Sequence, residues 1–555
     1  MTHYQAVERT GGQALVAQLI EEGVEHVFGI PGVQLDWAVE ALREAKERIR
    51  FVVPRHEQAA SYMADGYARS TGREGVCMVV PGPGVLNALS GISTSLACNS
   101  RVLMIAGQIT SEKIGKGFGL LHELPDQSGV LKSLTKWHGM ATRPEDIPAL
   151  VHEAFVQLRS GRPRPVAIEV PPDVLEAKAE IALLPRAQES RTEPDAGLIA
   201  QAAAMLGGAR LPVIYAGGGV MASGATEAVR ALAERLQAPV LMTEGGRGTL
   251  DDRHELALTS LGGRVLLPHT DVLLVAGSRF VDGIARPAFT SDGCKIIYLN
   301  IEAGDMAGPR QSGLAIEADV LTGVEALLAA LPEGIEAPSR AGIADAVRQW
   351  CDTQVSAIAP QKDYVAALRG TMADDDILVS ELTQIGYYAN IAFPVHGARK
   401  LITPGYQGTL GYGFNTALGV AVGNPAQRVV SINGDGGFAW GMQELSTLAR
   451  DGLDLSLVIF VDGRYGNVHR IQKRTFGETF VTDLRNPDFL KLAAAYDIPA
   501  EAVDTPEGLA QALRKAKERG GPALIAVRVE EMPSPWALIH PFVPPVSPPP
   551  PNPLG

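Results

Sequence analysis

The sequence has little of what marks secreted, membrane-spanning or disulfide-linked proteins. It contains four cysteines, none in a Cys-x-x-Cys pair, so we expect neither a disulfide framework nor a cysteine-bound metal. No apolar run reaches the roughly 18 residues that cross a bilayer. The first residues show no basic stretch followed by an apolar core, which is the pattern of a secretory signal. We therefore expect a cytoplasmic protein with reduced thiols and no membrane segment.

Positive charge is also scarce. The 49 lysines and arginines are outnumbered by 62 aspartates and glutamates, which gives a formal net charge of −13. Because an acidic surface repels a phosphate backbone, we expect no nucleic-acid partner. Any anionic ligand must be held by a local site rather than by the overall charge of the protein.

Apolar residues and glycine are abundant instead. Hydrophobic residues make up 46% of the 555 residues, and there are 60 glycines. This composition is typical of a globular α/β protein, and the length predicts three or four domains.

Short apolar runs alternate with helix-like stretches along most of the chain, which favours doubly wound parallel sheets. The expected strands are 26–30, 51–54, 76–80, 102–106 and 166–174, then 212–216, 239–242, 272–277 and 295–300, then 377–380, 429–434, 455–462 and 523–529. Polar linkers at 183–197 and 332–342 separate these groups. We therefore expect three α/β domains over 1–182, 198–331 and 343–532, followed by a Pro-rich tail over 533–555. Because proline cannot continue a helix or a central strand, the end of this tail should be either disordered or an extended arm on the surface.

The strongest motif joins a glycine-rich loop to two carboxylates. The apolar run 429–434 leads into Gly-Asp-Gly-Gly (434–437), and a helix is expected from about Gly441. Glycines let the backbone approach an anion closely, and a helix N-terminus supplies amides and a positive dipole end. The next expected strand ends in Asp462, 27 residues after Asp435. Two neighbouring parallel strands would thus each end in a carboxylate that can bind a divalent cation.

A second group of motifs lies in the first expected domain. Taken alone, Glu57 is an acidic residue at the start of an amphipathic helix, where the helix dipole favours negative charge. Its surroundings add three more motifs in order along the chain. These are Phe-Gly-Ile-Pro-Gly (28–32), Gly-Pro-Gly-Val-Leu-Asn (82–87) and Gly-Gln (107–108), with Glu57 itself inside Arg-His-Glu-Gln-Ala-Ala (55–60).

These motifs, in this order and over nearly the full length, resemble those of the thiamine-diphosphate-dependent acetolactate synthase and 2-oxo-acid decarboxylase family. The resemblance implies a pyrimidine-binding, a central and a diphosphate-binding domain. It makes Glu57 the carboxyl group that protonates the aminopyrimidine ring of the cofactor, which requires an apolar pocket that raises its pKa. It also implies that Mg²⁺ is held by Asp435, by the side chain at 462 and by the carbonyl of Arg464. The family usually has Asn-Asn where this chain has Val461-Asp462, so this site carries an additional negative charge.

Other cofactor contacts also follow from the resemblance. The segment 403–423 is similar to the family's cofactor-shaping segment, in which the Gly408 carbonyl accepts from the exocyclic amine and Leu410 is the bulky wedge. The remaining residues that it places around the cofactor are Pro83, Asn87, Gly434, Gly436, Gly437, Tyr465 and Gly466. Because Glu57 and Asp435 belong to domains that meet across a dimer interface in this family, we expect a homodimer or homotetramer.

The substrate is less well determined. Acetolactate synthases carry an arginine at the position of Gly283, and Arg286 is its nearest substitute here. Besides Glu57, the catalytic candidates are Gln108 and His122. Further candidates for substrate contact are Phe118, Lys136 and His469.

The expected activity is that of a lyase or transferase-type carboligase that acts on a small 2-oxo acid such as pyruvate. Simple decarboxylation to an aldehyde and an acyl-CoA lyase activity stay open as alternatives. A cofactor-binding homologue without turnover is disfavoured, because a pure binder needs no proton relay at Glu57. The glycines 217–219 suit FAD or another adenine nucleotide, but the flavin-contact pattern around 258–271 is poor, so we favour a purely structural central domain.

Overall fold

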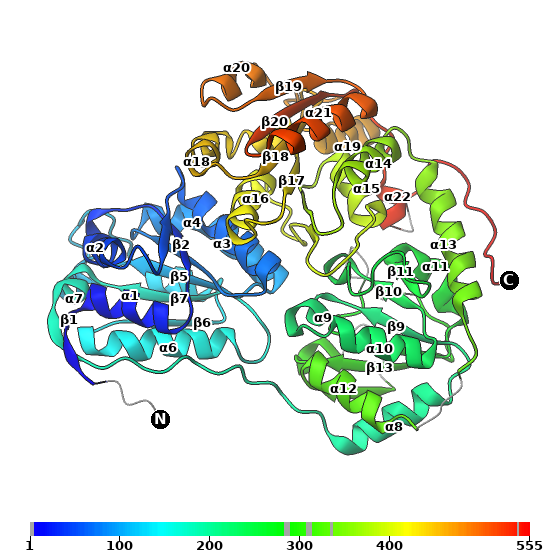
Figure 1. Ribbon diagram of the computed structural model, residues 1–555, viewed down its shortest axis with the longest axis horizontal. Coiled ribbons are helices and arrows are strands. Elements are labelled where there is room, and N and C mark those ends of the chain that lie inside the picture. The colour runs from blue at the N-terminus through cyan, green and yellow to red at the C-terminus, as the bar shows by residue number, and fades with distance from the viewer. Residues whose placement is uncertain (1–4, 282–288, 307–312, 333–336, 541–542) are drawn as a thin grey trace.

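The computed structural model describes residues 5–281, 289–306, 313–332, 337–540 and 543–555. Three six-stranded sheets, each with all of its strands parallel, organise the chain (Figure 1). Helices cover both faces of the sheets, as expected for buried parallel strands. The predicted α/β class with three doubly wound sheets is therefore confirmed.

The first sheet has the strand order β3-β2-β4-β5-β7-β6. Its strands are β2 (His26–Gly29), β3 (Arg50–Val52), β4 (Gly75–Val79), β5 (Val102–Gly107), β6 (Trp137–Met140) and β7 (Val166–Val170). Its helices are α1 (Gly11–Glu21), α2 (Asp36–Glu44), α3 (Glu57–Thr71), α4 (Pro83–Cys98), α5 (Gln127–Lys132), α6 (Ile147–Leu158) and α7 (Pro172–Glu176). A separate antiparallel pair, β1 (Val7–Thr10) with β8 (Lys178–Ile181), joins the two ends of this unit. The strand expected over 166–174 thus ends at Val170, because two prolines follow it and the second begins α7.

The second sheet has the order β11-β10-β9-β12-β13-β14. Its strands are β9 (Pro212–Ala216), β10 (Val240–Met242), β11 (Ala257–Thr259), β12 (Val272–Ala276), β13 (Lys295–Asn300) and β14 (Leu314–Glu317). Its helices are α8 (Ala196–Gly207), α9 (Gly218–Ser223), α10 (Thr226–Leu236), α11 (Gly263–Leu266) and α12 (Val320–Ala330).

The third sheet has the order β16-β15-β17-β18-β20-β19. Its strands are β15 (Ile377–Ser380), β16 (Leu401–Ile402), β17 (Val429–Gly434), β18 (Leu455–Val461), β19 (Ala500–Val503) and β20 (Ala523–Arg528). The helices of this part are α13 (Ala341–Ser356), α14 (Gln361–Thr371), α15 (Gln384–Ala392), α16 (Tyr412–Gly423), α17 (Asp435–Phe438), α18 (Leu445–Asp451), α19 (Gly466–Phe476), α20 (Phe489–Ala494), α21 (Pro506–Arg519) and α22 (Trp536–Ile539).

Two glycines allow the first and third sheets to be joined tightly through α3 and α16, which lie side by side in Figure 1. A Cβ atom on Gly419 would lie 1.9 Å from the Met63 carbonyl oxygen, and one on Gly66 would lie 2.2 Å from the Thr416 carbonyl oxygen. The two helix backbones therefore touch directly, which only glycine permits. This contact fixes the N-terminus of α3 relative to the third sheet.

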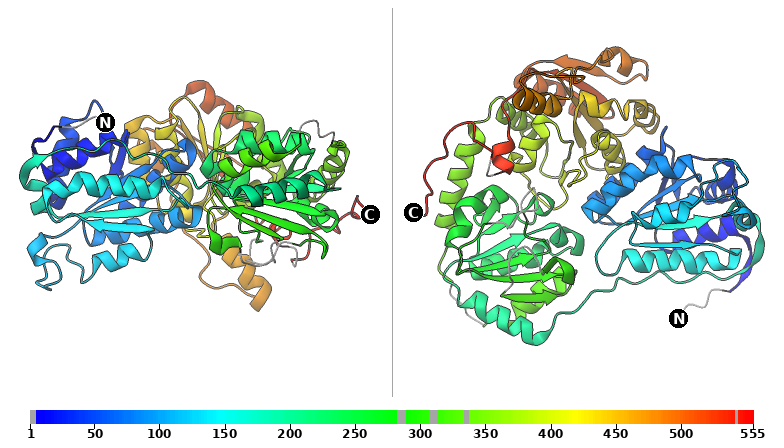
Figure 2. Two further views of the ribbon diagram at one scale, coloured as in Figure 1. Left: turned by 90° about the horizontal axis from the view of Figure 1, so that it is seen from below. Right: turned by 180° about the vertical axis from the view of Figure 1, so that it is seen from behind.

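The end of the chain is an extended arm. Residues 543–555 contain no helix or strand and run along the outside of α13 (Figure 2, right). The short helix α22 precedes them. Of the two alternatives for the tail, the structure thus has the surface arm.

None of the described helices is both long and apolar enough to cross a membrane. None of the four cysteines forms a disulfide, and burial raises the pKa of the Cys77 thiol to about 12.

Candidate active site

The glycine-rich loop follows the end of β17 directly. A one-turn helix, α17, begins at Asp435. The helix expected from about Gly441 is also present, as a 3-10 turn over Met442–Glu444 that leads into α18. A Cβ atom on Gly437 would lie 2.3 Å from a carboxylate oxygen of Glu381, and one on Gly436 would lie 2.9 Å from the Tyr465 ring. A side chain at either position would therefore displace Glu381 or Tyr465. The Gly436 amide donates to Asp435 Oδ1 over 2.9 Å, so it lies directly beside that carboxylate.

Two carboxylates flank this loop. Strands β17 and β18 are paired in parallel up to Gly434 and Phe460, so their carboxyl ends lie together. Asp435 Oδ2 accepts hydrogen bonds from the Gly463 amide at 2.8 Å and from Asn486 Nδ2 at 2.6 Å. Asp462 Oδ1 accepts from the Arg464 amide at 3.1 Å. The structure thus places the two aspartates at the ends of adjacent strands, as the sequence predicts.

The electrostatics of this pair suit a divalent cation. Burial raises the pKa of both Asp435 and Asp462, and the charge of Asp435 raises that of Asp462 further. Carboxylate oxygens are the ligands that Mg²⁺ prefers. In the part of the chain that the structure describes, no three His, Cys, Asp or Glu side chains converge on one point. A cation here would complete its shell with a backbone carbonyl such as that of Arg464, with water or with a ligand.

A third carboxyl group, which the sequence analysis missed, lies beside the loop. Glu381 follows β15 and is 5% exposed. Its Oε2 accepts from the Gly434 amide at 3.0 Å, whereas its Oε1 has no hydrogen-bond partner among the described residues. Burial raises the pKa of Glu381 to about 7, and the charge of Asp435 adds to the effect. The rule that ligands gather at the carboxyl ends of parallel strands would have identified it, because it directly follows the expected strand 377–380.

The start of α19 completes this side of the site. A Cβ atom on Gly466 would lie 2.5 Å from Asp462 Oδ2, so the helix start packs against that carboxylate. Arg464 Nη1 lies 3.4 Å from His469 Nε2, and His469 Nδ1 lies 3.0 Å from Thr482 Oγ1. His469 is thus fixed in position beside the metal loop.

Glu57 is the first residue of α3, and a side chain from the next motif orients it. Asn87 Nδ2 donates to Glu57 Oε2 over 3.0 Å. Asn87 lies in α4, whose first residue is Pro83 and whose preceding Gly82 has φ +59°. A Cβ atom on Gly82 would lie 2.5 Å from the His122 carbonyl oxygen. The structure thus brings four predicted residues, Glu57, Pro83, Asn87 and His122, to one turn.

His122 has an unusual local environment. Its φ of +68° is rare for a residue with a side chain, and its buried Nδ1 has no partner among the described residues. Phe118, four residues earlier, is 62% exposed. Neither has a fixed polar contact that would assign it a role, so both stay predictions.

Two other candidates are engaged by the protein itself. Gln108 Nε2 donates to Glu169 Oε2 over 2.8 Å, and its Oε1 accepts from the Ile109 amide over 2.7 Å. Lys136 Nζ donates to the carbonyl oxygens of Gln157 and Ser160, at 2.8 and 2.5 Å. Lys136 therefore satisfies carbonyl groups at the C-terminal end of α6. A role for Lys136 in substrate contact stays a prediction.

The cofactor-shaping segment, 403–423, leads from β16 into α16. Gly408 has φ +56°, and a Cβ atom there would lie 2.7 Å from Leu382 Cδ1. Leu410 is 41% exposed in the single chain. Other large apolar side chains of the first and third units are also exposed, namely Leu86, Tyr406, Trp440 and Met442.

Glu444 ties the Glu57 turn to the diphosphate loop. Both of its carboxylate oxygens lie 3.0 Å from the amide of Arg55, two residues before Glu57, and one accepts from Thr447 Oγ1 at 2.7 Å. Burial raises the pKa of Glu444. This contact crosses between the first and third sheets.

In the central unit, the glycines 217–219 have a packing role. Cβ atoms on Gly217 and Gly219 would lie 2.3 Å from the carbonyl oxygen and 2.6 Å from the Cα of Gly277. Gly218 is less crowded, with its nearest neighbour at 3.7 Å. The positions that bear on the missing synthase arginine, Gly283 and Arg286, lie outside the described residues.

Comparison with known proteins agrees with this geometry. Three family models match the chain in order: the thiamine pyrophosphate enzyme N-terminal TPP-binding domain over 9–130, the central domain over 199–327 and the C-terminal TPP-binding domain over 382–527. The glycine-rich loop and both aspartates fall within the last of these matches.

Full-length relatives agree with the family models. The chain is 31% identical to the large subunit of acetolactate synthase isozyme 1 from Escherichia coli, over 97% of this chain and 96% of the relative. It is 34% identical to a probable 2-ketoarginine decarboxylase of Pseudomonas aeruginosa, over 94% of each. It is 30% identical to a probable acetolactate synthase large subunit of Methanocaldococcus jannaschii, over 96% of this chain and 93% of the relative. The chain therefore belongs to the thiamine pyrophosphate enzymes and is an acetolactate synthase-like, thiamine-diphosphate-dependent carboligase or decarboxylase.

Proposed function

We propose that this enzyme uses thiamine diphosphate and Mg²⁺ to act as a carboligase or lyase on a small 2-oxo acid such as pyruvate. The pairing of Asp435 and Asp462 around the Gly-Asp-Gly-Gly loop carries this proposal, because it provides a cation site beside an anion-binding loop. The full-length relatives named as acetolactate synthases support the reaction class.

The residues present fit the cofactor. When bound, thiamine diphosphate supplies a carbanion at its thiazolium carbon. Asp435, Asp462 and the Arg464 carbonyl would hold Mg²⁺, and the amides around Gly436 and Gly437 would hold the diphosphate. Their crowded glycines support this, since a side chain at either position would collide with Glu381 or Tyr465.

At the other end of the cofactor, Glu57 would hold a proton between its carboxyl group and the pyrimidine ring. Asn87 would orient that carboxyl group through its 3.0 Å hydrogen bond. The Gly408 carbonyl would accept from the exocyclic amine, and Leu410 would set the angle between the two rings. Tyr465 and Gly466 would line the diphosphate end.

We propose a homodimer, or a tetramer built from it, with Glu57 of one chain facing Asp435 of the other. The exposed apolar side chains of Leu86, Tyr406, Leu410, Trp440 and Met442 support this, because a second chain would remove such apolar area from water. A cytoplasmic location also remains our prediction.

Simple decarboxylation is the second candidate. One relative is named as a probable 2-ketoarginine decarboxylase, and this chain has Gly283 where synthases carry an arginine toward the second 2-oxo acid. In the central domain, Gly217 and Gly219 are explained by backbone packing, so we propose that no FAD is needed there. Purified protein should show no flavin absorbance, and a stoichiometric flavin would contradict this.

A product assay tests these alternatives. Purified protein with Mg²⁺ and thiamine diphosphate is given pyruvate or 2-ketoarginine, and acetolactate, acetaldehyde, acetate and 4-guanidinobutanal are resolved. The Glu57→Gln variant is the control and should lose turnover by orders of magnitude while still binding the cofactor. Acetolactate from the wild type would establish carboligation, and an aldehyde alone would establish decarboxylation. Near-normal turnover by Glu57→Gln would refute the role of Glu57, and no product from either acid would direct the search to hydroxyacyl-CoA substrates.

A further inference from the structure

Side-chain hydrogen bonds and an apolar contact hold the C-terminal tail on the protein surface. Trp350 Nε1, on α13, donates to the Pro550 carbonyl over 3.0 Å, and Asn552 Nδ2 donates to the Val265 carbonyl over 3.2 Å. Leu554 packs against the adjoining hydrophobic core. An extended Pro-rich segment has no internal hydrogen bonds, so its carbonyls are free to accept from an aromatic N–H. The tail thus joins α13 to the central unit.

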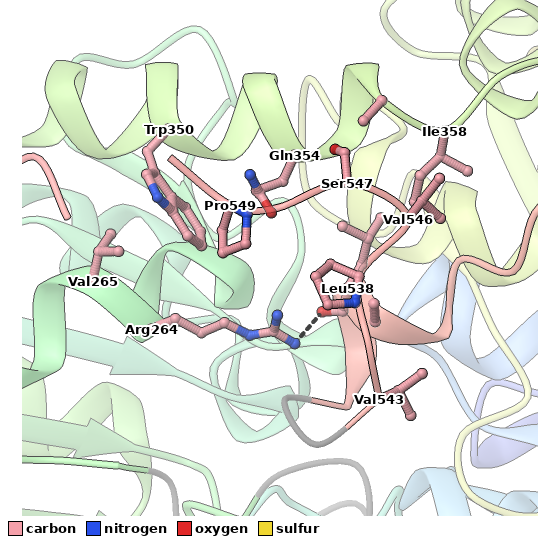
Figure 3. Close-up of a pocket in the computed structure, with 13 residues that line it drawn as sticks. Arg264, Val265, Trp350, Gln354, Ile358, Leu538, Val543, Val546, Ser547 and Pro549 are labelled. Carbon is pink, nitrogen blue, oxygen red and sulfur yellow. Dashed lines mark hydrogen bonds between the residues drawn. The ribbon is translucent and has the colours of Figure 1, made fainter. Parts of the chain in front are cut away.

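A cavity of about 250 Å³ lies between the tail and the helices α11, α13 and α22 (Figure 3). Three of its thirteen lining residues are polar: Arg264, Gln354 and Ser547. The others are apolar, with Trp350 and Val546 on opposite sides of the space. The volume is slightly below the range of about 300–1,000 Å³ typical of drug-sized ligands, so it suits a small metabolite.

The guanidinium of Arg264 points into this space without a counter-ion. Within the described part of the chain it makes one hydrogen bond, from Nη2 to the Leu538 carbonyl over 3.0 Å. Among the described residues no carboxylate pairs with it. The titratable group that acts on the Arg264 guanidinium is the Cys351 thiol, which burial keeps neutral by raising its pKa to about 12.

An unpaired arginine in an apolar cavity is costly, because the guanidinium stays protonated at all ordinary pH values. Burial lowers the pKa of Arg264 but cannot neutralise it. Its planar fork matches a carboxylate with two parallel hydrogen bonds. A single cation with apolar walls suits a monoanion with an apolar body, and it does not suit a polyanion such as a nucleotide.

We infer that this cavity binds a small aliphatic monocarboxylate, with its carboxylate on Arg264 and its chain between Trp350 and Val546, and that the C-terminal tail forms its cover. This site is separate from the Gly-Asp-Gly-Gly loop and does not depend on the proposed reaction.

Calorimetric titration of the cofactor-loaded enzyme with hexanoate tests the inference, with hexanamide as the uncharged probe. The wild type should bind hexanoate with a Kd of about 1 mM or below, and hexanamide at least tenfold more weakly. Arg264→Met should weaken hexanoate binding at least tenfold, and Arg264→Lys should give an intermediate loss because it keeps the charge but not the fork.

Arg235→Met is the matched control. Arg235 lies in the same unit and also donates to backbone carbonyls, those of Leu331 and Pro332, away from the cavity. The Arg235→Met variant should bind hexanoate as tightly as the wild type does. Equal binding by wild type and Arg264→Met would overturn the inference and assign the ligand to another site, such as the active site. Absence of saturable binding by the wild type would also overturn it.

Discussion

Burial of Glu381 beside the diphosphate loop should make the stability of the cofactor-free protein fall as the pH rises. Its ordinary pKa of 4.5 is raised to about 7 in the folded protein. The folded state therefore keeps this proton over a pH range in which the unfolded chain has released it. The stabilisation is fully present below pH 4.5 and is lost as the pH rises through 7.

The size of the effect follows from the shift. A difference of about 2.5 pKa units corresponds to about 3 kcal/mol over the whole range, at about 1.36 kcal/mol per unit. Between pH 6 and pH 8, where titration of the folded state takes place, the same relation gives a loss of about 1.3 kcal/mol. For a unit of roughly 150–250 residues this is about 3–5 °C in Tm.

Glu381→Gln isolates this contribution, because glutamine keeps the shape and can accept from the Gly434 amide but does not titrate. We expect the Tm of the wild type, measured by calorimetry in the presence of a chelator, to fall relative to that of the variant by about 3–5 °C between pH 6 and pH 8. A wild-type-minus-variant difference that stays constant over this range would refute the reasoning.

Three further results are expected. Asp462→Asn should retain Mg²⁺ and cofactor binding, because the amide oxygen still coordinates the cation. Asp462→Ala should weaken Mg²⁺ and cofactor binding in a calorimetric titration, and full loading of this variant would contradict the ligand role. Gly419→Ala should destabilise the protein by about 1–3 kcal/mol in thermal unfolding, because α3 and α16 must separate. The control is Gly370→Ala, whose Cβ meets nothing within 4 Å, and it should be neutral or slightly stabilising. Glu444→Ala should cost about 1–3 kcal/mol, because the Arg55 amide and the buried Thr447 hydroxyl both lose their acceptor, and Glu444→Gln should cost less. Equal losses would mean that these hydrogen bonds are unimportant.

The sequence predicted the interior strands of each sheet and one edge strand, β3, but it missed the other five edge strands. All strands expected from apolar runs exist, and the buried strand β9 (Pro212–Ala216) has the predicted bounds. The sheet strands missed were β6, β11, β14, β16 and β19, and every one of them lies at the end of its sheet. An edge strand pairs on one side only, is often short and is covered less completely, so its sequence need not form a continuous apolar run. β16, with two residues, is the extreme case.

The same distinction holds in the candidate site. Asp435 and Asp462 were predictable because each sits within or directly after a continuous strand and within a recognisable motif. Asn486, whose amide lies 2.6 Å from Asp435 Oδ2, comes from an irregular segment 24 residues after Asp462, and no local pattern marks it. Glu444 comes shortly after the glycine-rich motif, but its partner is a backbone amide 389 positions earlier. Contacts of this kind depend on how the domains dock, which strand and helix periodicities do not encode.

Asp435 couples the acidic groups of this site and so determines how they share charge. Its negative charge raises the pKa of both Glu381 and Asp462. In the metal-free protein the buried Glu381 is thus favoured in its neutral form, so it adds little negative charge to a site that has aspartate where the family usually has asparagine. Asp435→Asn should therefore lower the pKa of Glu381, and the pH-dependent Tm difference between proteins with and without the Glu381→Gln substitution should shift to lower pH. If that difference keeps its midpoint in the Asp435→Asn background, burial alone raises the pKa of Glu381 and the proposed coupling to Asp435 is wrong.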